Sequence, residues 1–119
     1  MPDDLFERYI KKAITNLPKE FKDKLDNVGF VVEERAAYSG RSLLLGLYQG
    51  VPQTRRGTGY GVGGTLPDKI TIFKGSILQI ARTEDQIKNQ VRNTILHEIG
   101  HHFGMSEEQV RRAQQHRRR

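Results

Sequence analysis

The sequence contains one pentapeptide that constrains the fold of the whole chain, His97-Glu98-Ile99-Gly100-His101. Two histidines four residues apart lie about 40° apart on one face of an α-helix, so a helix here lets both imidazoles reach one metal ion. Glu98 projects about 60° from His101 and misses the ion, but its carboxylate can contact a metal-bound water. This arrangement is typical of zinc hydrolases, in which a glutamate is the general base. We therefore predict Zn²⁺ at His97 and His101, with Glu98 as the catalytic base.

The helix that carries this motif is predicted to run from Glu84 to Phe103. Thr83 and Gln86 form a capping-box pattern at its start. Its apolar residues occupy a different sector of the helix from the two histidines, so the core face and the ligand face are separate. The apolar sector holds Ile87, Val91, Ile95, Ile99 and Phe103. The alternative is that both histidines are polar surface residues beside this core face.

The residues after the motif predict a sharp turn that can bring a third ligand to the metal. Gly104 suits a left-handed position after the helix end, and Ser106 with Gln109 forms a second capping-box pattern. Glu107 is the candidate third ligand and Glu108 is the alternative, although acids at a helix start are also favoured by the helix dipole. We expect His102 to support the site or face the substrate rather than to bind the metal.

The remaining segments predict a mixture of helices and strands, and therefore an α+β fold. Helical spacing of apolar residues is seen near the N-terminus, whereas β-branched and aromatic residues alternate in later segments. We predict a helix over Asp4 to Asn16, short turns over Lys19 to Leu25, strands over Val28 to Glu34, Ser42 to Tyr48 and Asp68 to Lys74, a loop over Ala36 to Arg41, and a short helix over Gly75 to Ala81 whose Ile77, Leu78 and Ile80 face the core.

A glycine-rich segment from Gly50 to Pro67 contains a formal G-x-G-x-x-G pattern at Gly59 to Gly64. A dinucleotide-binding fingerprint must leave a strand and open a helix. Here Thr65-Leu66-Pro67-Asp68 follows, which opens no helix. The segment is therefore interpreted as a flexible loop beside a cleft.

The length of 119 residues accommodates a single domain, 1–119. The chain has no cysteine for disulfides or thiolate ligands, no apolar run long enough to cross a membrane, and an acidic N-terminus without a signal-peptide core, so we expect a cytoplasmic protein. Five arginines lie within the last nine residues, and outside this basic tail, 111–119, 15 basic residues nearly balance 14 acidic ones. A solvated helix end is favoured over a nucleic-acid contact for this tail.

The stretch from His97 to Glu107 resembles the small bacterial zincin-like metallopeptidase family, whose members are described as minimal zincins. The likeness extends to Leu25 to Val28, Leu44 to Gly50, Pro52, Arg55 to Gly57 and Leu66 to Gly75, which is most of the chain. The resemblance implies a small three- to four-stranded mixed sheet packed against an active-site helix, with an N-terminal helix and a short C-terminal helix. Its motif H-E-x-x-H-x-x-G-x-x-[D/E] supports Glu107 as the third ligand. Only residues 108–119 follow, and they lack the methionine that a metzincin Met-turn needs.

The same resemblance implies that a strand before the active-site helix borders the cleft, and Asp68 to Lys74, with Ile70 and Ile72, is the candidate. An extended peptide would pair with the free edge of that strand, and the N-terminal helix, with Phe6 and Tyr9, would partly cover the cleft. An oxyanion also needs a donor besides the metal. Tyr60 and Tyr48 are candidates for this donor, although packing is the favoured role for each.

These predictions describe a zinc-dependent metallopeptidase that acts on peptides or proteins, with its substrate and oligomeric state unassigned. The alternative is a non-catalytic metal-binding or regulatory module, with nucleic-acid contact through the arginine tail. Glu98 argues against that alternative, because a structural metal site has no use for a general base at this position.

Overall fold

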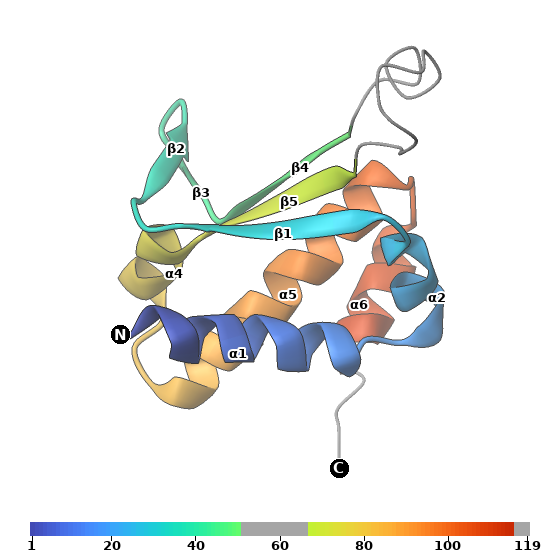
Figure 1. Ribbon diagram of the computed structural model, residues 1–119. Helices are drawn as coiled ribbons and strands as arrows, with labels where there is room; N and C mark the ends of the chain where they lie inside the picture. Colours follow the sequence, from blue (N-terminus) through green and yellow to red (C-terminus); the bar gives the residue numbers. More distant parts are fainter. Residues whose placement is uncertain (51–66, 116–119) are drawn as a thin grey trace, which may run out of the picture.

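The computed structural model describes residues 1–50 and 67–115, and Figure 1 shows a small sheet with helices packed against one of its faces. The fold class is α+β, as predicted. The helical elements are α1 (Asp3–Thr15), α2 (Lys19–Lys22), the 3₁₀ turn η1 (Asp23–Leu25), α4 (Lys74–Ile80), α5 (Glu84–His102) and α6 (Glu107–Gln115). The strands are β1 (Val28–Glu33), β2 (Ala37–Ser39), β3 (Ser42–Leu44), β4 (Gly46–Gln49) and β5 (Asp68–Phe73). The predicted glycine-rich loop falls almost entirely outside the described residues.

The main sheet has three strands in the order β1-β5-β4. β5 pairs in parallel with β1 and antiparallel with β4, so it is the central strand and β4 lies at an edge. Tyr48 is opposite Ile70 in this register, and the N–H of Phe73 donates to the carbonyl of Leu45 at 2.9 Å. The predicted strand over Asp68 to Lys74 therefore exists, but its position in the sheet differs from the prediction.

The segment predicted as one strand over Ser42 to Tyr48 is two strands that belong to different sheets. β3 pairs antiparallel with β2 in a separate hairpin, and β4 joins the main sheet. The prediction of a loop over Ala36 to Arg41 was therefore wrong, because β2 begins at Ala37. Gly40 has a φ of 61° in the turn, a conformation that glycine adopts without strain.

The longest helix, α5, crosses beneath the sheet (Figure 1) and begins at the predicted cap. The N–H of Gln86 donates to the Thr83 hydroxyl at 3.1 Å, and the Gln86 side chain accepts from the Thr83 N–H at 3.2 Å. Ile87, Val91, Ile95 and Ile99 are all buried, which confirms most of the predicted core face of this helix. Phe103 differs, because it lies just past the helix end and is 37% exposed.

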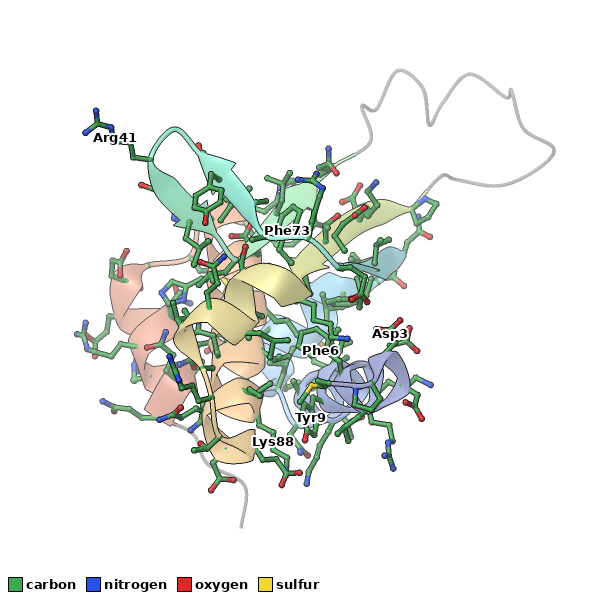
Figure 2. All side chains as sticks on the ribbon, turned by 90° about the vertical axis from the view of Figure 1, so that its left-hand side faces the viewer. Asp3, Phe6, Tyr9, Arg41, Phe73 and Lys88 are labelled. Atoms are coloured by element: carbon green, nitrogen blue, oxygen red, sulfur yellow. The ribbon has the colours of Figure 1, made fainter. Side chains whose placement is uncertain are left out.

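The N-terminal helix α1 is part of the core rather than a cover over a cleft. Phe6 is fully buried and Tyr9 is 6% exposed, and α1 packs against α5. Figure 2 shows both side chains on the side of α1 that faces the other helices. The Tyr9 hydroxyl donates to the Glu84 carboxylate at 2.9 Å and so joins α1 to the start of α5. The prediction that Phe6 and Tyr9 cover a cleft was therefore wrong.

The short helix α4 follows β5 without a loop and places only part of its predicted apolar set in the core. Ile77 is fully buried, whereas Ile80, at the C-terminal end of the helix, is 52% exposed. Lys74, its first residue, is 4% exposed, and its ammonium donates to the carbonyl of Met1 at 2.6 Å and to Asp3 at 2.7 Å. The hydrogen bond with Asp3 is the main cause that raises the pKa of Lys74. None of the helices in residues 1–50 and 67–115 has the length and apolarity needed to cross a bilayer.

Candidate metal centre

His97 and His101 lie one turn apart on α5, and both side chains are exposed. Nδ1 of His97 lies 2.9 Å from the carbonyl oxygen of Asn93. A proton on Nδ1 donates to this carbonyl and leaves the lone pair of Nε2 available to a metal. Two exposed imidazoles on one helix face, one of them oriented by a backbone carbonyl, are donors that suit Zn²⁺.

Glu98 is half-buried between α5 and β4, and its carboxylate accepts a hydrogen bond from the backbone N–H of Tyr48 at 3.0 Å. Burial raises the pKa of Glu98 above its ordinary value, although the Tyr48 N–H and the charges of His101 and His97 act in the opposite direction. A carboxyl group with a raised pKa is better matched to proton transfer near neutral pH. The environment of Glu98 is therefore suited to a general base.

The close approach of α5 to β4 depends on Gly46, for which no role was predicted from the sequence. A Cβ atom at Gly46 would lie 2.7 Å from Cγ2 of Thr94 and 3.5 Å from Cγ of Glu98. Any larger residue at this position would push the helix and the strand apart. Its signal in the sequence was an isolated glycine within an apolar strand, a pattern that often marks close backbone approach.

The turn after α5 has the predicted form. Gly104 has a φ of 67°, and the N–H of Met105 donates to the carbonyl of Gly100 at 2.8 Å, as in a Schellman motif. The Ser106 hydroxyl then accepts from the N–H of Gln109 at 3.0 Å, and the Gln109 side chain accepts from the Ser106 N–H at 2.8 Å. This capping box starts α6 at Glu107 and reverses the chain beside the two histidines.

The structure does not gather a third acidic ligand around the histidines. Within the described ranges, no three His, Cys, Asp or Glu side chains are arranged so that they could hold one metal ion. Glu107 is exposed at the first position of α6, and Glu108 pairs with Arg111 and, at 3.7 Å, with Arg112. The assignment of Glu107 as third ligand stays a prediction.

The helix α6 packs against α5 close to the motif. A Cβ atom at Gly100 would lie 2.6 Å from Cγ2 of Val110, so glycine at this motif position lets the two helices pack closely. Near the C-terminal end of α6, Nε2 of Gln114 lies 3.3 Å from Nδ1 and 3.4 Å from Nε2 of His97. Gln114 is thus a polar neighbour of the candidate ligand that no local sequence pattern reveals, because the two residues are 17 positions apart.

The ring of His102 packs against the edge strand β4. It projects from α5 in a different direction from His97 and His101. Its ring stacks on Tyr48, with centroids 3.8 Å apart and planes inclined by 15°, and meets Phe103 edge-on at 4.8 Å. The hydroxyl of Tyr48 donates to the carboxylate of Asp68 at 2.7 Å. The hydroxyl of Tyr48 is therefore engaged by Asp68, and its role as an oxyanion donor stays a prediction. The supporting role of His102 stays a prediction, and Tyr60 lies outside the described residues.

The strand β5 was predicted to border the cleft with a free edge and with Ile70 and Ile72 near the substrate, and both predictions were wrong. β5 has no free edge, because it pairs with β1 on one side and β4 on the other. Ile70 and Ile72 are fully buried in the core and therefore offer no surface to a substrate. The edge strand beside Glu98 is β4, not β5.

An open cavity of about 460 Å³ lies between the junction of β3 and β4 and the middle of α5. One wall comes from the three leucines that precede Gly46, and the opposite wall comes from α5. His97 and Glu98 also line it, so the cavity is continuous with the candidate site.

Comparisons with known proteins agree with this architecture. A family model described as zincin-like metallopeptidase matches residues 25–117. A solved structure, described as a conserved hypothetical protein from Thermus thermophilus, superposes with a TM-score of 0.61 and is 25% identical over 87% of this chain and 94% of that one. No curated protein sequence gives a significant match.

Proposed function

Because the chain belongs to the zincin-like metallopeptidase family, we propose that it is a zinc-dependent peptidase with Glu98 as general base. The observation that carries the proposal is the position of Glu98, half-buried against β4 and next in sequence to one of two exposed histidines. A metal site that only stabilised the fold would have no need of a partly desolvated carboxylate at its side.

His97 and His101 would hold the ion, and Glu107 is the residue proposed to complete the ligand set. The turn at Gly104 and the cap at Ser106 support this, because they reverse the chain after α5 and start α6 at Glu107. The chemistry that bound Zn²⁺ supplies is Lewis acidity, which lowers the pKa of water to about 7 and polarises a carbonyl group.

Glu98 would perform the proton transfers. Its carboxylate accepts a proton from the attacking water, whose oxygen forms a bond to the carbonyl carbon of the substrate. The same proton is then delivered to the amine nitrogen as the peptide C–N bond breaks. The products are a carboxylic acid and an amine, and Glu98 returns to its ionised form. The raised pKa of Glu98 supports this role, because a more basic carboxylate accepts a proton more readily.

The substrate would lie extended along β4, at the edge of the sheet. Main-chain hydrogen bonds to an edge strand hold a peptide without regard to its side chains. The contact between Glu98 and the N–H of Tyr48 supports this placement, because it puts the base within reach of a chain lying on that strand.

The proposal is tested by measuring hydrolysis of casein or a fluorogenic peptide pool by the purified full-length protein. Activity should disappear when a chelator removes the metal and return when one equivalent of Zn²⁺ is added. Hydrolysis that persists unchanged in the metal-free protein would contradict a zinc-dependent mechanism.

A further inference from the structure

The strand β1 forms the edge of the main sheet opposite to β4, and within the part of the chain that the structure describes it is paired on one side only. The N–H of Asp68 donates to the carbonyl of Asn27 at 3.1 Å. Hydrogen bonds alternate along a parallel ladder, so the main-chain groups of Val28, Phe30 and Val32 point away from β5. An edge of this kind is a template for pairing with another strand.

An open groove of about 400 Å³ lies between β1 and the helix α1, which runs below this strand in Figure 1. Its apolar lining includes Ile14, Phe30 and Val32, which are only half-buried. Removing such side chains from water is favourable. The free strand edge and the groove beside it therefore form one surface that a second chain can cover with both its main chain and its side chains.

Two charged side chains at the rim of the groove indicate which chain fits this surface. Glu7 and Lys11 lie one turn apart on α1, and both are exposed. Neither side chain forms an ion pair or a hydrogen bond with another described residue. In a dimer with two-fold symmetry, two α1 helices that lie side by side run antiparallel, so that Glu7 of each copy meets Lys11 of the other. The rim is thus complementary in charge to itself.

We propose that this surface is the interface of a symmetric dimer, in which the β1 strands of two copies pair antiparallel and each α1 covers the groove of the other copy. A second copy fits better than an unrelated peptide, because the strand edge and the charged rim are both self-complementary. The two sheets join through β1, and β4 of each copy stays at an outer edge. The dimer therefore leaves both proposed substrate strands accessible, and its existence does not depend on peptidase activity.

The first test is the mass of the full-length protein in solution, measured by sedimentation equilibrium over a range of concentrations. The wild type should be a dimer that dissociates on dilution. Lys11→Glu and Glu7→Lys should each weaken the dimer by about tenfold, because two symmetric contacts change from attraction to repulsion. Arg41→Glu, at the exposed tip of the hairpin in Figure 2, makes the same change of charge and should have no effect. A wild type that stays monomeric at every concentration would overturn the proposal.

Mixing the two single variants separates a contact between copies from a change within one helix. Like charges one turn apart also destabilise α1 itself in each variant, and this effect persists in the mixture. A copy with Lys11→Glu that meets a copy with Glu7→Lys has attractive contacts again. A heterodimer should therefore form with close to the wild-type affinity, whereas Glu7→Lys mixed with Arg41→Glu should show no such recovery. Absence of the heterodimer in the first mixture would contradict the proposed interface.

The second test examines the strand edge by amide hydrogen exchange, followed by NMR at low and high protein concentration. The amides of Phe30 and Val32 should become protected as the dimer forms. Those of Val31 and Glu33 already face β5 and should be protected at both concentrations. Exchange at Phe30 and Val32 that does not depend on concentration would overturn the pairing of the β1 strands, even in a protein that dimerises.

Discussion

The carboxylate of Glu98 accepts a hydrogen bond from the backbone N–H of Tyr48 at 3.0 Å, so the proposed base is attached to the edge strand. The ring of Tyr48 in turn stacks on His102, four residues beyond Glu98 on the same region of α5. Tyr48 therefore links β4, the strand that would hold the substrate, to α5, the helix that would hold the metal. Substitutions that separate β4 from α5 should lower peptide hydrolysis even though they replace no proposed metal ligand.

Substitution of Gly46 by alanine should produce such a separation. The added Cβ would lie 2.7 Å from Cγ2 of Thr94 and 3.2 Å from the carbonyl oxygen of Thr71. We expect a loss of about 1–3 kcal/mol in the free energy of unfolding, as for other overpacked sites, and a fall in kcat. Urea denaturation and peptide hydrolysis measure the two effects.

A second variant checks that the clash is the cause. Thr94→Ser removes Cγ2 and keeps the hydroxyl that accepts from Gln90. Combining it with Gly46→Ala should restore part of the lost stability and activity. Strictly additive effects of the two substitutions would contradict the proposed contact.

Gly100→Ala should destabilise the packing of α6 on α5, because its Cβ would lie 2.6 Å from Cγ2 of Val110. We expect a lower midpoint of thermal unfolding, together with weaker zinc binding if α6 supplies a ligand. Val110→Ala makes room for the new methyl group, so the double variant should be more stable than Gly100→Ala alone. A double variant that is less stable than either single variant would show that the two positions do not clash.

The third ligand is tested by a matched pair of substitutions at the start of α6. Glu107→Gln and Glu108→Gln remove the same charge from neighbouring positions and affect the helix dipole similarly. Isothermal titration with Zn²⁺ should show a loss of affinity of about 100-fold for Glu107→Gln and wild-type affinity for Glu108→Gln. The reverse order would assign the metal to Glu108.

The hydrogen bond from Tyr9 to Glu84 predicts a contribution to stability that depends on pH. Donation by Tyr9 is the main cause that lowers the pKa of Glu84 below its ordinary value of 4.5. A lowered carboxyl pKa stabilises the fold above the pKa of the unfolded chain, and the contribution is lost as the pH falls through the folded value. The difference in the free energy of unfolding between wild type and Tyr9→Phe should therefore become smaller below pH 4.5.

Urea denaturation at neutral pH and below the ordinary carboxyl pKa measures this difference. Tyr38→Phe is the control, because the hydroxyl of Tyr38 meets the neutral side chain of Gln79 and its contribution should not vary with pH. A difference for Tyr9→Phe that is equally large in acid would rule out the ionised state of Glu84 as its source.

The features that were predicted correctly from the sequence are those set by neighbouring residues. The caps at Thr83 and Ser106 and the turn at Gly104 each depend on residues within a few positions, and all three form as predicted. The core face of α5 follows from helical spacing alone. These local features place His97 and His101 together on one exposed face.

The order of the strands could not be obtained in the same way, because pairing joins residues far apart in the sequence. The strand with a free edge at the cleft was predicted to be Asp68 to Lys74, although Ile70-Thr71-Ile72-Phe73 is buried throughout, as in a central strand. The signal in the sequence for the central position was a short run that is apolar at every position except Thr71. The contact between Glu98 and Tyr48 spans 50 positions and leaves no local pattern, although the isolated Gly46 indicates that another element comes close.

In the proposed mechanism, Glu98 transfers protons and does not hold the metal. The most direct measurement is zinc content and peptide hydrolysis in one preparation of Glu98→Gln, which keeps the size and shape of the side chain. We predict one zinc ion per chain, as in wild type, with turnover reduced by at least about 100-fold. Wild-type turnover in the zinc-loaded variant, or loss of the metal itself, would contradict the assignment of Glu98 as general base.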